Sequence, residues 1–325
     1  MADGPALYED GGPEHHQGTD FDVRTVVAHM PREVKERFWY DSVPWQRFHH
    51  AYGPGIDVPD RLEGLRSREP KTADRALGLL WGSVCHQGQT SAPGALAVPF
   101  LLRIAADPST HNRAQVLLLV AEVARREHYG DGTRAGLLRT ADDGLAYDSS
   151  GYLQNWSVQA AREPVAADAH LLLPLLDEPD PEIRQAACYA LAAASGKVEH
   201  ITAALHERLR AEPDRAVRAG LVLGIGQLAW DHHDERVVKQ ARTWWSNPEQ
   251  PVEVRASAAL AWLCLVDGPV PDDLRAVLDT IVTDDLARLL ASVPWMRNVE
   301  YRGDGLRHCL DQILNPDAYP WFAAQ

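Results

Sequence analysis

The sequence has few cysteines, few lysines and no long apolar run. Its four cysteines (Cys85, Cys188, Cys264 and Cys309) lie far apart and form no Cys-x-x-Cys pair, so neither a redox pair nor a thiolate zinc site is expected. No stretch of about 18 apolar residues could span a membrane. The first residues carry no basic segment followed by an apolar one, so no secretory leader is expected. These features predict a soluble protein of the reducing cytoplasm.

The chain is also short of positive charge. Lysine contributes four of the 32 basic residues, and 46 acidic residues leave a formal net charge of −14. Proteins that bind nucleic acids usually have the opposite balance, because each phosphate contact needs a Lys or Arg that is available to make it. Nucleic acid is therefore not an expected partner, and the lack of a long apolar run makes a membrane equally unexpected. The preference for arginine over lysine is typical of a bacterial protein from a GC-rich genome.

Alternation of apolar and polar residues, the pattern of a β-strand, is nearly absent. From about residue 61, apolar residues recur every three or four positions in blocks separated by short turns that contain Pro or Asp. This spacing predicts an all-α protein.

Four segments align with one another and define an internal repeat. In each, a Pro follows an acidic residue in a turn, an Arg stands five positions later, and an Ala/Leu-rich helix follows. The segments are RSREPKTADRALGLLWGSV (66–84), AADPSTHNRAQVLLLVAEVA (105–124), LDEPDPEIRQAACYALAAAS (176–195) and RAEPDRAVRAGLVLGIGQLA (210–229). A fifth copy has Pro248 and Arg255, with two extra residues in its turn.

The repeated arginines are separated by 38, 71, 34 and 37 positions. They are Arg75, Arg113, Arg184, Arg218 and Arg255. Because 71 is two periods, one degenerate unit is expected at about 114–175. A period of about 35 residues with two helices in each is typical of an α-solenoid.

The segments DEPDPEIRQAACYALA and EPDRAVRAGLVLGIG resemble HEAT repeats of the short bacterial kind, including the bilin-lyase HEAT-like type, and the resemblance extends over roughly 62–292. It implies a right-handed α-solenoid of about six helix pairs. It implies nothing specific about function.

The repeated pattern also has a physical explanation that does not depend on the family resemblance. Pro ends the first helix of each pair and shapes the turn, and an acidic side chain caps the second helix. Small side chains let helices approach, as expected for the glycines of LGIGQL (223–228). The five arginines are predicted to form a structural ladder, each near the start of a second helix and bonded to a neighbouring turn.

The segments outside the repeats have their own expected roles. Residues 1–20 are predicted to be a disordered acidic tail, and residues 21–60 an aromatic-rich N-terminal cap that ends in the linker GPGIDVPD (53–60). HEAT-like repeats are expected over 61–292, with a long loop at about 139–151. Residues 293–325 are predicted to form an aromatic C-terminal cap.

Candidate binding residues stand near the ends of predicted second helices. Trp81 and His86 end one such helix. Trp230, Asp231 and His233 stand at the corresponding place of another. The alternative for both histidines is that they cap helix C-termini and satisfy backbone carbonyls.

Tyr152 and Trp156 follow the long loop between these two places. Aromatic side chains offer a large contact area at low rotamer cost, and His can donate, accept or titrate near neutral pH. The predicted concave groove is therefore flanked by Trp81, His86, Tyr152, Trp156, Trp230, Asp231 and His233. If proton transfer occurs there, the catalytic candidates are His86, Asp231 and His233.

Signatures of enzymes and metal sites are missing. No H-E-x-x-H motif, P-loop, G-x-S-x-G motif or Rossmann glycine fingerprint occurs. His232 with Asp231 and Asp234 is a weak candidate for a divalent metal. We predict neither a metal nor a cofactor.

Three functions from different classes remain. The leading prediction is a non-enzymatic scaffold that binds a protein or peptide on its concave face, in an assembly, regulatory or immunity role. The alternative is a small-molecule-binding protein or an enzyme acting on a specialised metabolite in an aromatic and histidine pocket. A DNA-repair glycosylase is a minor alternative, which the negative charge disfavours.

Overall fold

The computed structural model describes residues 13–126, 132–141, 146–297, 299, 305–315 and 318. The chain divides into two compact units. Unit 1 comprises Met1–Glu127, Ala141–Leu175 and Ala193–Lys197, and unit 2 comprises His128–Thr140, Leu176–Ala192 and Val198–Gln325. The described residues form 16 α-helices and only four strands of two residues each, so the predicted all-α class is confirmed.

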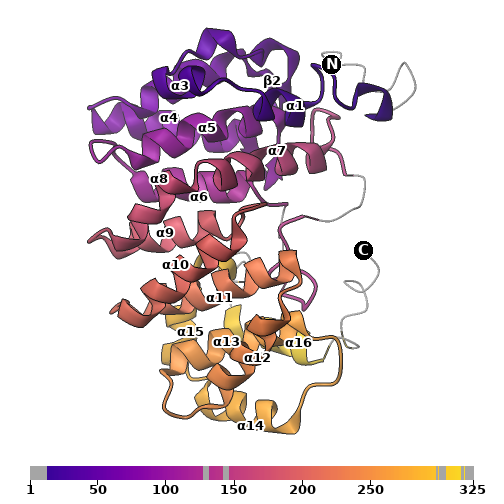
Figure 1. The fold of residues 1–325 in the computed structure, drawn as a ribbon, viewed down its shortest axis with the longest axis vertical. Helices are drawn as coiled ribbons and strands as arrows, with labels where there is room; N and C mark the ends of the chain where they lie inside the picture. Colours follow the sequence, from indigo (N-terminus) through magenta and orange to yellow (C-terminus); the bar gives the residue numbers. More distant parts are fainter. Residues whose placement is uncertain are drawn as a thin grey trace. The chain divides into compact units, whose positions relative to one another are not determined.

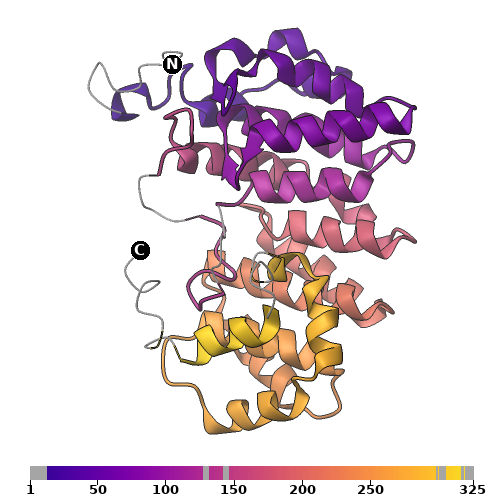
Figure 2. The same ribbon diagram turned by 180° about the vertical axis from the view of Figure 1, so that it is seen from behind.

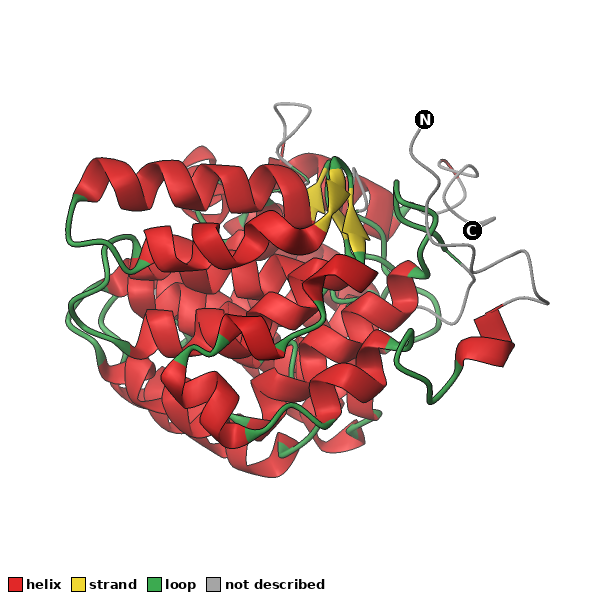
Figure 3. Ribbon diagram, turned by 90° about the horizontal axis from the view of Figure 1, so that it is seen from above, coloured by secondary structure: helices red, strands yellow, loops and turns green. Residues whose placement is uncertain are grey.

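Unit 1 contains eight described α-helices and two short hairpins. The helices are α1 (Val23–Ala28), α2 (Arg32–Arg37), α3 (Val58–Leu65), α4 (Pro70–Val84), α5 (Ala92–Ala106), α6 (Arg113–Val123), α7 (Gln154–Ala167) and α8 (Ala169–Leu172). The antiparallel hairpins pair β1 (His49–His50) with β2 (Gly53–Pro54) and β3 (Cys85–His86) with β4 (Gln89–Thr90). Figure 3 shows these strands in yellow among the red helices.

Helix α5 lies at the centre of unit 1. It is apolar on nearly every side and almost entirely buried, as expected of a helix that has neighbours all around it. Helices α6 and α7 pack against it, and α3 and α4 also contact it; Figure 1 shows α4 to α7 side by side, from indigo to magenta. Pro99 removes one backbone donor from α5, and Arg103 donates a hydrogen bond of 2.7 Å to the Pro99 carbonyl oxygen.

The aromatic N-terminal segment packs onto α5. The ring centroids of Tyr40 and Trp45 lie 5.1 and 6.3 Å from that of Phe100. The predicted linker 53–60 differs from expectation, because it forms β2, the 3-10 helix Gly55–Asp57 and the start of α3.

Unit 2 contains the other eight described α-helices. They are α9 (Pro181–Leu191), α10 (Val198–Ala211), α11 (Arg215–His232), α12 (Glu235–Ser246), α13 (Val252–Leu265), α14 (Asp272–Ile281), α15 (Asp284–Ala291) and α16 (Gly305–Leu314). Seen from behind, α15 and α16 lie on the near side of unit 2 in gold and yellow (Figure 2), and both contact α13.

Helix α11 packs against both α9 and α13, while α10 contacts α11 and α12 contacts α13. Its glycines allow this close approach. A Cβ at Gly224 would lie 2.9 Å from the Cys188 sulfur of α9, and one at Gly226 would lie 2.8 Å from the Ala261 Cβ of α13. The predicted packing role of the LGIGQL glycines is therefore confirmed.

The acidic caps predicted from the repeat are present in unit 2. The Asp180 carboxylate accepts the Glu182 N–H at 2.9 Å, and the Asp214 carboxylate accepts the Val217 N–H at 3.0 Å. These bonds satisfy backbone donors that the first turns of α9 and α11 leave without a helical partner.

The degenerate unit departs furthest from the expected pattern. None of the described residues between Val123 and Gln154 belongs to an α-helix, and these include residues 132–138, which precede the predicted loop at 139–151. Glycines recur through this stretch, and each costs a helix about 1 kcal/mol relative to alanine. Residues 127–131 and 142–145 of it lie outside the described residues.

The two termini are described in part. Residues 1–12 of the predicted disordered tail lie outside the described residues. Pro13–His16 form one 3-10 turn, and the Gly18 N–H donates to Asp22 at 3.0 Å, so this part of the tail is folded. The predicted C-terminal cap contributes the 3-10 helix Pro294–Met296 and α16. Within the described ranges, none of the helices combines the length and hydropathy of a bilayer-spanning segment.

Candidate functional site

A cavity in unit 2 contains two of the predicted binding residues, Trp230 and His233. It has a volume of about 330 Å³ and lies where the end of α11 meets the start of α12 and the end of α13. Its lining residues are Ala229, Trp230, His233, Asp234, Glu235, Val238, Leu265 and Asp267.

A tight turn between α11 and α12 shapes this cavity. Helix α11 ends at His232, and His233 adopts a left-handed conformation with a φ of 54°. The N–H groups of His233 and Asp234 both donate to the Ala229 carbonyl oxygen. The Asp234 carboxylate then caps α12 by accepting the Arg236 N–H at 2.9 Å. This reversal lets side chains of both helices line one cavity.

Charge around the cavity is mainly negative. Asp234, Glu235 and Asp267 belong to its lining, and no lysine or arginine is among the described lining residues. The exposed Arg236 forms an ion pair of 2.8 Å with Asp234, and its guanidinium holds the pKa of that carboxyl below the usual value. The cavity therefore combines apolar walls with an acidic rim.

Asp231, predicted to orient a histidine, is directed elsewhere. Its carboxylate oxygens accept the Thr140 hydroxyl at 2.9 and 3.0 Å, and Thr140 is fully buried. Asp231 does not line the cavity. It holds Thr140 against the end of α11, which is a structural role.

His86 lies in β3 of unit 1 and not at the end of a helix, because α4 stops at Val84 and the chain turns into the β3–β4 hairpin. Its Nδ1 lies 3.1 Å from the Gly82 carbonyl oxygen, the kind of contact that the capping alternative predicts. The same nitrogen is 3.2 Å from the Tyr52 hydroxyl, and the two rings meet edge-on with centroids 5.2 Å apart. Trp81, in the last turn of α4, is half-buried.

Tyr52 is an exposed aromatic residue that the sequence analysis missed. Its side chain is 68% exposed at the turn between β1 and β2. Beneath it, Nδ1 of the buried His50 accepts the Tyr52 N–H at 3.1 Å, which leaves Nε2–H to donate to Asp57 at 2.9 Å. The Tyr-Gly-Pro turn that follows the His pair was the available signal, because such turns lie at the surface.

Tyr152 is buried in unit 1, with an exposed fraction of 2%. Its hydroxyl donates to the Phe21 carbonyl oxygen at 2.6 Å and accepts the Val23 N–H at 3.0 Å. Burial raises the pKa of this hydroxyl above its ordinary range. Tyr152 therefore joins the chain before α7 to the start of α1 and offers little surface to a partner.

Trp156 is half-buried on α7. The Arg24 guanidinium lies 4.1 Å from the centroid of its ring and also binds Asp22. One face of Trp156 is thus already covered by a cation of the same unit. Because His86 belongs to unit 1 and His233 to unit 2, a groove that includes both stays a prediction.

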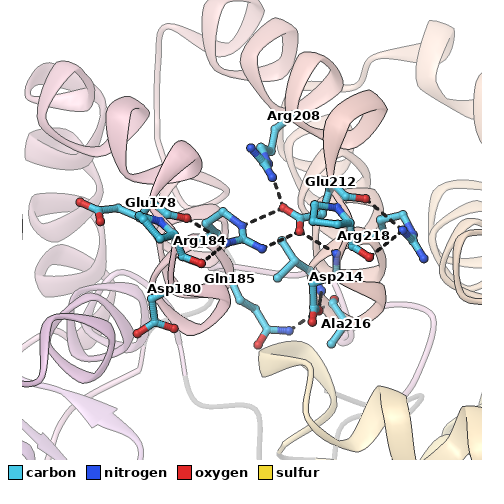
Figure 4. A network of polar contacts seen from close by, with 12 residues as sticks. Glu178, Asp180, Arg184, Gln185, Arg208, Glu212, Asp214, Ala216 and Arg218 are labelled. Atoms are coloured by element: carbon cyan, nitrogen blue, oxygen red, sulfur yellow. Dashed lines mark hydrogen bonds and ion pairs between the residues drawn. The ribbon is translucent and has the colours of Figure 1, made fainter.

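Arg184 and Arg218 make contacts of the same kinds in α9 and α11 of unit 2, which are separated in the chain by α10 (Figure 4). Each is the fourth residue of its helix, α9 or α11. Arg184 donates to the carbonyl oxygens of Glu178 and Pro179, both at 2.8 Å, and to the Glu212 carboxylate at 2.7 and 2.9 Å.

Arg218 repeats this arrangement one period later. It donates to the carbonyl oxygens of Glu212 and Pro213 at 2.9 and 3.0 Å, and to Glu253 at 2.6 and 2.8 Å. Glu212 therefore connects the two arginines, with its carboxylate bound to one and its carbonyl oxygen to the other.

The other three arginines of the predicted ladder differ. Arg255 is also the fourth residue of its helix, α13, and donates to the Trp245 carbonyl oxygen at 3.2 Å. Arg113 is the first residue of α6 and donates to the Ala105 carbonyl oxygen at 3.0 Å. Arg75 is exposed on α4. The prediction that all five arginines occupy equivalent positions is therefore wrong. The reason is that α4 and α6 of unit 1 begin at other points of the repeat than α9, α11 and α13 do.

No group of three or more His, Cys, Asp or Glu side chains within the described ranges is placed to hold a metal. The weak candidate set of Asp231, His232 and Asp234 lies within these ranges. A comparison of the chain with protein-family models, curated proteins and solved structures finds no match.

Proposed function

We propose that this chain is a HEAT-like helical-repeat protein that binds a protein or peptide partner. The main support for the repeat architecture is that Arg184 and Arg218 make contacts of the same kinds. Each donates to two preceding carbonyl oxygens and to a glutamate of the following repeat. Two helices with the same internal bonds, at the same helical position, support a periodic architecture. Solenoids of this kind use their extended surfaces to bind partners.

Helix pairing supports the same proposal in each unit. Helices α3 and α4, and α5 and α6, contact one another in unit 1, as α10 and α11, and α12 and α13, do in unit 2. With α7 and the short α8, which also contact each other, this gives five pairs of consecutive helices in contact, which is close to the number in the right-handed solenoid that the sequence resemblance implies.

The cavity at the end of α11 supports binding as the activity. It combines the half-buried Trp230 with polar groups at its edge, and aromatic residues in partly buried sites are typical of interface hot spots. The four cysteines are buried and form no disulfide, which fits the proposed place of action in the reducing cytoplasm.

A direct test is recovery of the partner from the cells that encode the protein. The tagged full chain is cross-linked in vivo and purified, beside Trp230→Ala and the control Trp39→Ala, which removes an exposed tryptophan of unit 1. We expect one defined protein to accompany the wild type and Trp39→Ala and to be depleted about tenfold with Trp230→Ala, a loss of about 1.4 kcal/mol. Equal recovery with all three variants, or no enriched protein, contradicts the proposal.

A small-molecule-binding protein, or an enzyme acting on an aromatic metabolite, is the second candidate. The observation that favours it is the cavity itself, since ligand pockets begin at about 300 Å³. Native mass spectrometry of the purified chain distinguishes the two candidates. A stoichiometric small molecule that Trp230→Ala releases supports the second.

A further inference from the structure

We infer that the cavity at the end of α11 receives an arginine side chain of the bound partner. This inference rests on the proposed function, because it assigns the arginine to the protein or peptide that the chain binds. It follows from the chemistry of the lining residues in unit 2.

The aromatic wall is the first reason. Elsewhere the fold covers aromatic rings with its own arginines: Arg24 lies 4.1 Å from the Trp156 centroid and Arg37 lies 5.2 Å from the Trp39 centroid. Among the described residues, no arginine or lysine lies over the ring of Trp230. Tryptophan is the best aromatic partner for a cation, and this ring is open to one.

The acidic rim is the second reason. Arg236 already binds Asp234, but neither Glu235 nor Asp267 forms an ion pair among the described residues, and both are exposed. Their carboxylates stand at the edge of an apolar cavity with no basic residue in its described lining. A partner group that enters the cavity meets these carboxylates, and the chain as a whole has a net charge of −14. This negative charge attracts a cation and repels a phosphate or a carboxylate.

The apolar walls distinguish a side chain from a free ion. Val238 and Leu265 line the cavity beside Trp230. A metal ion or ammonium ion gains nothing from such walls, whereas the methylene stem of arginine packs on them while its charged end stays at the rim. The planar guanidinium also stacks on an aromatic ring and donates two parallel hydrogen bonds to a carboxylate, which lysine does not do.

The test uses the full chain with ¹⁵N-labelled tryptophan and the capped tripeptide acetyl-Gly-Arg-Gly-amide as the probe. The indole resonance of Trp230 is assigned by its loss in Trp230→Phe. We expect the arginine peptide to shift this resonance saturably, with an affinity that falls as salt rises. The citrulline peptide, which has the same shape without the charge, should produce no saturable shift, and the lysine peptide should bind more weakly.

Charge variants complete the test. The combined substitutions Glu235→Gln and Asp267→Asn should weaken binding of the arginine peptide by about tenfold. Glu249→Gln, which removes an exposed carboxylate outside the cavity, should leave binding unchanged. Equal shifts from the arginine and citrulline peptides, no saturable shift, or no effect of the double substitution each overturn the assignment.

The failure of this inference can be distinguished from failure of the proposed function. If a cellular partner is recovered but its binding does not respond to the double substitution, the arginine assignment is wrong and the binding function stands. If the arginine peptide binds as expected while no cellular partner is found, the affinity of the cavity for arginine stands and the proposed function fails.

Discussion

The guanidinium of Arg184 binds the carboxylate of Glu212 through two parallel hydrogen bonds of 2.9 and 2.7 Å, and the side chains are 6% and 0% exposed. This buried pair joins the first turn of α9 to the end of α10. Glu212 also accepts a hydrogen bond of 2.8 Å from Arg208 and one of 2.9 Å from the Asp214 N–H. One carboxylate thus accepts four hydrogen bonds from three groups and connects two repeats.

Removing the arginine should be costly, because it leaves a buried carboxylate short of its main partner. We expect Arg184→Ala to lower the free energy of unfolding by about 3 kcal/mol. Arg75→Ala is the matched control, since Arg75 is exposed and a surface substitution changes stability by about 0.5 kcal/mol or less. Urea unfolding measured by far-UV circular dichroism checks both. Similar losses in the two variants would contradict the structural difference between these arginines.

The same carboxylate should make stability depend on pH. Burial alone would raise the pKa of Glu212, but hydrogen bonds from Arg184, the Asp214 N–H and Arg208 hold this pKa below its ordinary value of 4.5. The folded state then binds a proton less readily than the unfolded state. The stability from Glu212 is therefore complete above about pH 4.5 and is lost as the pH falls through the lower folded pKa.

Unfolding free energies measured from pH 7 down to pH 3 check this dependence. Glu212→Gln keeps the shape but removes the titration, so its stability should fall less steeply over the acidic range than that of the wild type. Parallel curves for the two proteins would show that Glu212 does not contribute.

Tight binding of duplex DNA should be absent near 150 mM salt, because affinity for phosphates depends on available basic side chains. Arg184, Arg218 and Arg103 are engaged in internal ion pairs, and the net charge is −14. Fluorescence anisotropy with a labelled duplex is the measurement. Submicromolar binding at that salt concentration would favour the glycosylase alternative.

Local patterns in the sequence predicted the local features of the fold. The caps by Asp180 and Asp214 and the packing role of Gly224 follow from short-range rules of helix geometry. Contacts between distant residues could not be read in this way. The Tyr152 hydroxyl binds a carbonyl oxygen 131 positions away, and Asp231 binds a threonine 91 positions away, so their burial and their structural roles depend on the tertiary fold.

Candidate site residues were predicted from their position at helix ends, and the structure brings two of them to one cavity only where a helix ends as expected. Helix α11 ends at His232, so Trp230 and His233 reach one cavity. Helix α4 ends two residues before His86, where a Gln-Gly turn with positive φ at Gln87 and Gly88 forms a hairpin instead. A turn of this length leaves too weak a signal in an otherwise helical pattern.

His233 provides the last prediction, because its backbone favours a different residue. It has a φ of 54° immediately after α11, the left-handed position at which glycine is the preferred residue. We expect His233→Gly to raise the free energy of unfolding by about 0.5 to 1 kcal/mol. His232→Gly, which places glycine in the last turn of α11, should instead lower it by up to about 1 kcal/mol. Thermal and urea unfolding of the two variants check the opposite signs. If His233→Gly is more stable but no longer binds the partner, the side chain of His233 is retained for binding at the expense of stability. A loss of stability in both variants would show instead that the His233 side chain supports the fold.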